Sequence, residues 1–318
     1  MKLVKLFIFI LIFLNILNAK EYQASFTYLA SSGVTSLVYK DDKIYVGTRG
    51  STLDIFDIKT KKRIKSITLE KIKDFMGDLV DSKIYSIDVL DDMILILSQG
   101  EKGGRDINIY KDGKLINLIS SKERMFIAQA KFISKDKIVF ALLSNQVYLF
   151  DIKSKTNIYK KQISQSKFSH FVINEDKKNI VIADESGILN MLEVKSFKVI
   201  KKFEKQNLDN VFQVDLKNNI ILTAGQDRRA VVYNIKRNTA YYKTTNFLIY
   251  SAGLSPSGNL GAIAYNENNE ISVFNTKTKK DLHILKDNQT TITNIIFISE
   301  NEILVSSDDN RINYYKID

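Results

Sequence analysis

Residues 211–236 read VFQVDLKNNIILTAGQDRRAVVYNIK and contain three short apolar runs separated by two polar turns. Alternating side chains and many β-branched or aromatic residues make each run typical of a β-strand. Between the second and third runs, residues 226–229 place four polar side chains in a row: Gln226, Asp227, Arg228 and Arg229. The surrounding fold decides whether these side chains form a turn or a binding site.

The same three-strand pattern recurs along the chain. Its first strands begin at Val34, Ile84, Ile127, Phe168, Val211, Ile249 and Ile292, which gives a period of about 43 residues. A basic turn and a fourth strand close most repeats, as in RIKSITLE from Arg63 to Glu70. Four short strands at this period are typical of a β-propeller blade. The sequence therefore predicts an all-β, seven-bladed β-propeller.

The seventh repeat lacks a fourth strand, because the chain ends at Asp318 directly after the third. The missing strand has a candidate near the N-terminus, YQASFTYL from Tyr22 to Leu29. Pairing of this segment with the last blade would close the ring and remove its open sheet edges. We therefore predict one propeller domain over residues 20–318.

The N-terminus is predicted to be a signal peptide covering residues 1–19. Lys2 and Lys5 precede the apolar run Leu6–Leu17, and Asn18 and Ala19 offer a small residue before a cut. The run is short for a bilayer span, so a retained anchor is the less favoured alternative. The chain has no Cys, which excludes lipoprotein anchoring. We expect an exported, periplasmic protein with no integral membrane segment after cleavage.

No catalytic set is found in the sequence. The absence of Cys excludes disulfides, and the two His are far apart, which argues against a His-built metal centre. The segment GEKGGR lacks the Ser or Thr and the following helix of a phosphate loop. A Ca²⁺ site from Asp184, Glu185 and Asp308 has no further support. We expect no enzyme activity, no cofactor and no bound metal.

The net charge is +11, and it falls to +9 without Lys2 and Lys5. An exported protein rarely meets nucleic acid, so we expect a protein partner and a monomeric chain. In a blade with alternating strands, the first–second and third–fourth turns open on one face. That first face would carry a rim of basic residues, either a basic binding face or solvated hairpin tips: Lys59, Lys61, Lys62, Lys153, Lys155, Lys236, Arg237, Lys277, Lys279 and Lys280.

The second face would carry the irregular loops, including the longest connection, Glu70–Lys83, and the segment QGEKGGR from Gln99 to Arg105. Loops on a rigid scaffold are where binding usually occurs. We therefore predict a partner-binding face formed by the following residues: Arg49, Phe75, Met76, Asp78, Arg105, Asp184, Glu185, Gln226, Asp227, Arg228, Arg229 and Arg311.

Within this set, Asp227 is expected to cap backbone N–H groups of its turn, with Asp309 as its counterpart in the last blade. Such a turn does not need Arg228 or Arg229, and Arg is well suited to carboxylate and other anions. Successive strand residues point to opposite sides, so we expect at most one of the two to face the axis. Asp184 and Glu185 are candidate acidic counterparts of these arginines.

Two resemblances extend this interpretation. GQDRRAVVYN and SDDNRINYYK resemble the end of a WD repeat, although every Trp and the Gly-His pair of that family are missing, so its hydrogen-bonded tetrad is not carried over. The order of the chain is also similar to periplasmic nitrate reductase accessory proteins of the NapL type. That similarity rests on the signal peptide, the repeats and the pieces IKDFMGD, SQGEKGGR, FSHFVINED, ADESG, DNVFQVD, AGQDRR and LIYSAGLSPSG.

The second resemblance implies a non-catalytic accessory factor that docks on the periplasmic nitrate reductase system. Two alternatives stay open. One is an outer-membrane or envelope assembly scaffold, although the Cys anchor of the propeller lipoproteins is missing. The other is a propeller enzyme of lactonase or quinoprotein type, although a quinone usually stacks on Trp and the chain has none.

Overall fold

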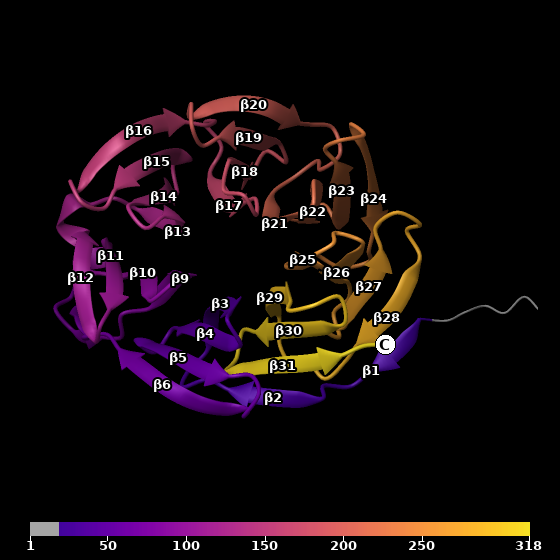
Figure 1. Ribbon diagram of the computed structural model, residues 1–318, viewed down its shortest axis with the longest axis horizontal. Helices are drawn as coiled ribbons and strands as arrows, with labels where there is room; N and C mark the ends of the chain where they lie inside the picture. The colour runs from indigo at the N-terminus through magenta and orange to yellow at the C-terminus, as the bar shows by residue number, and fades with distance from the viewer. Residues whose placement is uncertain (1–18) are drawn as a thin grey trace, which may run out of the picture.

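Seven β-sheets surround a central channel in the computed structural model, which describes residues 19–318 (Figure 1). The predicted seven-bladed propeller is therefore confirmed. The predicted signal peptide lies outside the described residues, apart from Ala19. Within each blade the strands follow one another from the channel outward, and apart from β1 and β2 each strand pairs antiparallel with its sequence neighbour.

The first four blades follow the chain without interruption. Blade 1 contains β3 (Val34–Lys40), β4 (Lys43–Thr48), β5 (Thr52–Asp57) and β6 (Lys62–Thr68). Blade 2 contains β9 (Ile84–Leu90), β10 (Met93–Gln99), β11 (Arg105–Lys111) and β12 (Lys114–Ile119). Blade 3 contains β13 (Ile127–Ser134), β14 (Lys137–Leu142), β15 (Gln146–Asp151) and β16 (Thr156–Gln162). Blade 4 contains β17 (Phe168–Ile173), β18 (Asn179–Asp184), β19 (Leu189–Glu193) and β20 (Lys198–Phe203).

Blade 5 follows the same order and contains β21 (Val211–Lys217), β22 (Ile220–Gly225), β23 (Arg229–Asn234) and β24 (Thr239–Thr244). The last two blades each take one strand from the N-terminal segment. Blade 6 contains β25 (Ala252–Leu254), β26 (Leu260–Ala264), β27 (Ile271–Asn275), β28 (Asp281–Leu285) and β1 (Lys20–Tyr22). Blade 7 contains β29 (Ile292–Phe297), β30 (Glu302–Ser307), β31 (Arg311–Lys316) and β2 (Phe26–Leu29). The first strand of blade 6 starts at Ala252, three residues later than the sequence pattern indicates.

Ring closure differs in one respect from the prediction. The segment Tyr22–Leu29 is not one strand but the end of β1 and all of β2, separated near Ala24. β2 pairs antiparallel with β31 and closes blade 7 as expected, whereas β1 pairs in parallel with β28 of blade 6 (Figure 1). At this break the Ala24 N–H donates to the Asp287 carboxylate at 2.9 Å. The N-terminal segment therefore joins two blades instead of one.

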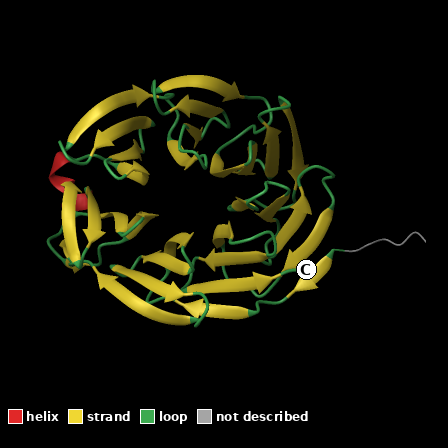
Figure 2. Cartoon of the chain, in the orientation of Figure 1, coloured by secondary structure: helices red, strands yellow, loops and turns green. Residues whose placement is uncertain are grey.

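Two short elements and one hairpin interrupt the regular pattern near blade 2. The 3₁₀ turns are η1 (Glu101–Gly103) and η2 (Ser121–Glu123), which Figure 2 shows at the edge of this blade. The hairpin of β7 (Ile72–Lys73) and β8 (Leu79–Val80) lies in the connection from blade 1 to blade 2. Among residues 19–318, the helical segments have three residues each, far fewer than a bilayer span needs.

Polar side chains of the inner strands link several neighbouring blades around the channel. Asp88 accepts from the Phe132 N–H, Gln129 from the Phe171 N–H, and Asp215 from the Leu254 N–H, each at 2.8 Å. Because blades splay apart around a ring, these innermost backbone groups lack a partner strand, and a buried unpaired N–H is unfavourable. The inner strands beside the channel therefore carry polar side chains, whereas the outer parts of the blade interfaces are apolar.

Candidate functional site

The β7–β8 hairpin holds an apolar tip away from the propeller surface. Phe75 is 77% exposed, Met76 86% and Leu79 66%. Asp74 organises the turn, because one of its oxygens accepts from the Met76 N–H at 2.8 Å and the Asp78 N–H at 3.0 Å. The apolar side chains are thus exposed by a turn with defined hydrogen bonds, as a binding element requires.

The hairpin rests on blade 2. The Phe75 ring lies against Gly103, where a Cβ would be 2.8 Å from the ring edge, and Gly103 has a φ of +74°. η1 contacts both β7 and η2, and Phe126, three residues after η2, is 55% exposed. We call the exposed side chains of Phe75, Met76, Leu79 and Phe126 the apolar patch. Exposed apolar side chains that gather on one face usually mark an interaction site.

Three cations lie beside this loop cluster. The Arg105 guanidinium stacks on the Tyr85 ring with 3.4 Å between its central carbon and the ring centre, and Lys83 Nζ lies 5.3 Å from the same centre. Burial lowers the pKa of Lys83, and the charges of Arg49 and Arg105 lower it further. Arg49 pairs with Asp308 of blade 7. We call Arg49, Lys83 and Arg105 the cation cluster.

Arg105 is the least satisfied member of the cluster. Its Nε and Nη1 atoms are buried and have no hydrogen-bond partner within residues 19–318. Burial lowers the pKa of Arg105 to about 10, so the side chain is still charged at neutral pH. Leaving a buried charged donor unpaired is unfavourable by about 1–3 kcal/mol or more. Because both atoms are buried, Arg105 contributes to the site through the positive charge of the cation cluster and not through these two donors.

In the turn between β22 and β23, Asp227 and Arg229 have structural roles. Asp227 accepts from the Leu208 N–H at 2.7 Å and the Arg229 N–H at 3.1 Å, so its predicted structural role is confirmed. Asp309 does the same for Arg311 at 2.9 Å. Arg229 donates to the Gln206 carbonyl at 2.8 Å and lies over Tyr242, so it is also part of the fold. Only Gln226 and Arg228 are exposed to solvent.

Asp184 and Glu185 do not serve as counterparts of those arginines. Asp184 is fully buried, and its oxygens accept from Asn145 Nδ2 at 2.9 Å and Ser164 Oγ at 2.7 Å. Glu185 pairs with Lys167 at 3.6 Å. The prediction that Asp184 is offered to a partner is therefore wrong, because its carboxylate already binds the loops around it. Arg311 Nε lies 3.9 Å from Asp309 of its own turn.

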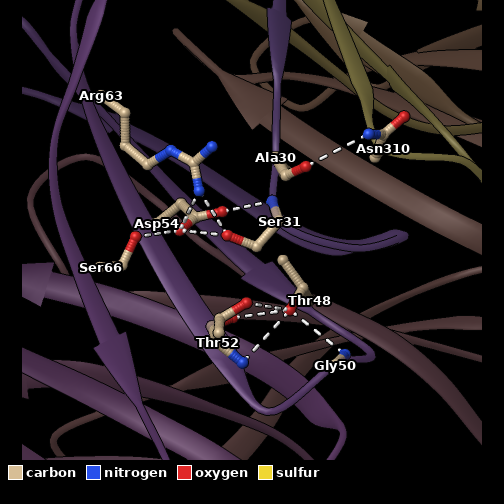
Figure 3. Close-up of polar contacts among 9 residues, drawn as sticks. All are labelled: Ala30, Ser31, Thr48, Gly50, Thr52, Asp54, Arg63, Ser66 and Asn310. Atoms are coloured by element: carbon tan, nitrogen blue, oxygen red, sulfur yellow. Dashed lines mark hydrogen bonds and ion pairs between the residues drawn. The ribbon is translucent and has the colours of Figure 1, made fainter.

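Asp54 of β5 has a comparable structural role that the sequence did not indicate (Figure 3). Its buried carboxylate accepts from the Ser31 N–H at 2.6 Å and from Ser66 Oγ at 2.5 Å, and Arg63 lies 3.3 Å away. Ser31 follows β2 directly, so Asp54 fastens the closing strand of blade 7 to blade 1. Nearby, Asn310 donates to the Ala30 carbonyl at 3.3 Å.

The basic rim expected on the first face is only partly basic. Lys59 pairs with Asp42 at 2.5 Å, and Lys153 pairs with Asp136 at 3.0 Å. Each of these acids belongs to the first–second turn of the same blade. Exposed lysines and carboxylates therefore alternate in blades 1 and 3, which favours the alternative of solvated hairpin tips there.

The channel has a volume of about 780 Å³ and is lined by inner strands, with His170 in its wall. Both ring nitrogens of His170 face donors, the Val214 N–H at 3.4 Å and Gln129 Nε2 at 3.3 Å. A neutral ring has one nitrogen that can accept from these groups, whereas a protonated ring has none, so the neutral form is favoured. Burial, helped by the charge of Lys131, lowers the pKa of His170 to about 4. Within residues 19–318, no three His, Asp or Glu side chains are grouped as a metal site.

This depressed pKa predicts loss of stability in mild acid. The unfolded chain protonates His170 near pH 6.5, whereas the folded chain stays neutral to about pH 4. The contribution of neutral His170 to the free energy of unfolding is therefore fully present above pH 6.5 and is lost as the pH falls to 4. The loss is at most about 3 kcal/mol, and it is smaller where channel water solvates the ring. Urea unfolding of wild type and His170→Gln at several pH values measures the contribution of His170 to the pH dependence of the free energy of unfolding. The interpretation is wrong if the two proteins show the same pH dependence.

The fold and loops define a seven-bladed propeller with an irregular face at blades 1–3. No protein-family model matches the sequence, and a comparison with curated proteins finds no match. Among solved structures, the β-propeller domain of Cps50 (Swd1) from Myceliophteria thermophila is similar, with a TM-score of 0.74 and 14% identity. The match covers 93% of this chain and 99% of the other. At this identity the similarity supports the fold alone.

Proposed function

We propose that the chain is a non-catalytic docking protein that binds an acidic, partly apolar protein segment at the second face of blades 1–3. The observation that carries this proposal is the apolar patch, with Phe75 77% and Met76 86% exposed, beside the cation cluster in which the Arg105 guanidinium stacks on Tyr85. The positive charge of such a cluster is well suited to a carboxylate. The apolar patch supplies the contacts that exclude water around such a pair.

The site lies on two loops that also carry part of the family resemblance found in the sequence. IKDFMGD contains Phe75 and Met76, and SQGEKGGR ends at Arg105; both pieces belong to the resemblance to the NapL-type accessory proteins. We therefore propose the periplasmic nitrate reductase system as the partner. The proposal includes export through the N-terminal signal, which cell fractionation and N-terminal sequencing of the mature chain would test.

Affinity capture from periplasm during nitrate respiration tests the partner and the site together. Phe75→Ser/Met76→Ser and Arg105→Gln are expected to reduce recovery of nitrate reductase subunits by at least about tenfold, because each removes a central contact. The matched control is Leu115→Ser/Ile116→Ser, which changes two apolar side chains of β12 that are 43% and 48% exposed. The control should capture as well as wild type.

Equal capture by wild type and by the patch and Arg105 variants would contradict the proposed site. Capture of other proteins without any nitrate reductase subunit, still dependent on the patch, would retain the docking function and reject the nitrate assignment.

A further inference from the structure

A pocket on the first face brings three cations together. This pocket of about 200 Å³ lies between blades 5 and 6, and its lining includes Lys236, Arg237 and Lys277. None of these three forms an ion pair with another residue in the range 19–318, and no carboxylate lines the pocket. The remaining lining is mainly amide and hydroxyl side chains, such as Asn219 and Ser257.

Internal comparison of the blades shows that this arrangement is not required by the fold. The residue after the third strand donates its N–H to the first–second turn in six blades, and in five of these a Lys comes next. Four of the bonds run from Ile58 to Asp42 at 2.9 Å, Ile152 to Asp136 at 2.8 Å, Ile235 to Asn219 at 2.9 Å and Thr276 to Asn259 at 2.8 Å. The other two run from Val194 of blade 4, also followed by a Lys, to Lys178 at 2.8 Å and from Ile317 of blade 7 to Asn301 at 2.9 Å. Lys59, Lys153, Lys236 and Lys277 each follow that residue, so they occupy equivalent positions. The acids that neutralise Lys59 and Lys153 are amides in blades 5 and 6.

A second set of acids is replaced in the same way. Asp57 and Asp151 end the third strands of blades 1 and 3 and accept from the N–H of Thr60 at 2.7 Å and of Ser154 at 2.8 Å. In blades 5 and 6 the equivalent Asn234 and Asn275 keep these turn bonds, each at 2.9 Å. The amides therefore preserve the turns and remove the negative charges, which leaves a pocket with three cations and neutral hydrogen-bonding groups.

Two acids from neighbouring blades bind backbone N–H groups of the pocket lining. Glu175 of blade 4 accepts from the Asn218 N–H at 2.8 Å, and Glu300 of blade 7 accepts from the Ser257 N–H at 2.7 Å. Across the pocket, Asn218 Nδ2 donates to the Ser257 carbonyl at 3.0 Å and ties the two blades together. The walls are thus fixed, while the three cationic side chains are exposed and available.

We propose that the pocket between blades 5 and 6 binds a phosphate group through Lys236, Arg237 and Lys277. Phosphate carries more than one negative charge and several acceptor oxygens, which matches three cations better than a single carboxylate does. The phosphate is either a small soluble anion or the headgroup of an anionic lipid. The pocket lies on the face opposite the apolar patch, so this inference does not depend on the docking function.

Isothermal titration calorimetry with pyrophosphate at low ionic strength tests the proposal on the mature chain. Lys236→Asn/Lys277→Asn is expected to weaken binding by at least about tenfold. Lys59→Asn/Lys153→Asn removes the same charge at equivalent positions of blades 1 and 3 and should leave binding unchanged. Asn219→Asp/Asn259→Asp restores the acids found in those blades and should also abolish binding, with an unchanged thermal midpoint that shows intact folding.

A parallel arm distinguishes the source of the phosphate. Sedimentation with phosphatidylglycerol vesicles, compared with phosphatidylcholine vesicles, should depend on the same two pocket variants if the group is a lipid headgroup. Binding of pyrophosphate alone assigns a soluble anion. The proposal is overturned if neither probe binds, or if the blade 1 and blade 3 control loses as much affinity as the pocket variants.

Discussion

Tyr28→Ala is expected to lower the free energy of unfolding by about 3–5 kcal/mol, the range for removing a large buried ring. Tyr28 is 2% exposed in the closing strand β2, and its ring lies 5.4 Å from that of Phe56 in blade 1. Its hydroxyl also donates to the Ile58 carbonyl at 3.3 Å. The substitution therefore opens a cavity where the two ends of the ring meet.

Urea unfolding of the purified protein measures this loss, with the same midpoint by fluorescence and circular dichroism as the check on two-state behaviour. The adjacent Leu29 is 54% exposed, so Leu29→Ala should change stability by no more than about 0.5 kcal/mol. Equal effects at the two positions would show that β2 does not close the ring as described.

Asp184→Ala is expected to destabilise the protein by about 3 kcal/mol, because it leaves several buried donors without an acceptor. Besides Asn145 and Ser164, the carboxylate accepts from the Ser186 N–H at 2.9 Å and from Ser186 Oγ at 2.5 Å. Asp184→Asn keeps one acceptor oxygen and should lose roughly half as much. Thermal and chemical unfolding of the purified variants check both values.

The neighbouring Glu185 supplies the control. Its pair with Lys167 is solvent-exposed, and such pairs contribute about 0–1 kcal/mol. Glu185→Ala should therefore be nearly neutral. If Asp184→Ala were as mild as Glu185→Ala, the carboxylate would not be holding the loops between blades 3 and 4.

The repeats could be predicted from the sequence because propeller blades are local structures. Each strand pairs mainly with its sequence neighbour, so alternation and turn residues were enough to place seven blades and the role of Asp227. The split of Tyr22–Leu29 could not be seen in this way. It depends on pairing of β1 with β28 and on contacts such as the Ala24 N–H with Asp287, which join segments far apart in the chain.

The site was predicted less completely for the same reason. The sequence indicated Phe75, Met76 and Arg105 because their loops break the repeat, but it missed Lys83, which lies at the end of the same connection. It also placed Asp184 on the surface, since a polar residue beside a turn gives no indication of burial. Both errors arise from contacts between neighbouring blades, which no single repeat contains.

Site-specific photocrosslinking tests the central claim, docking through the apolar patch, most directly. A photoreactive p-benzoylphenylalanine replaces Phe75 in one protein and Leu115 in another, and both are irradiated in cells respiring nitrate. Position 75 lies in the proposed site, and position 115 lies on the outer strand of blade 2. We expect an adduct with a nitrate reductase subunit from position 75 and none from position 115. No adduct from position 75, or equal adducts from both positions, would contradict docking through this patch.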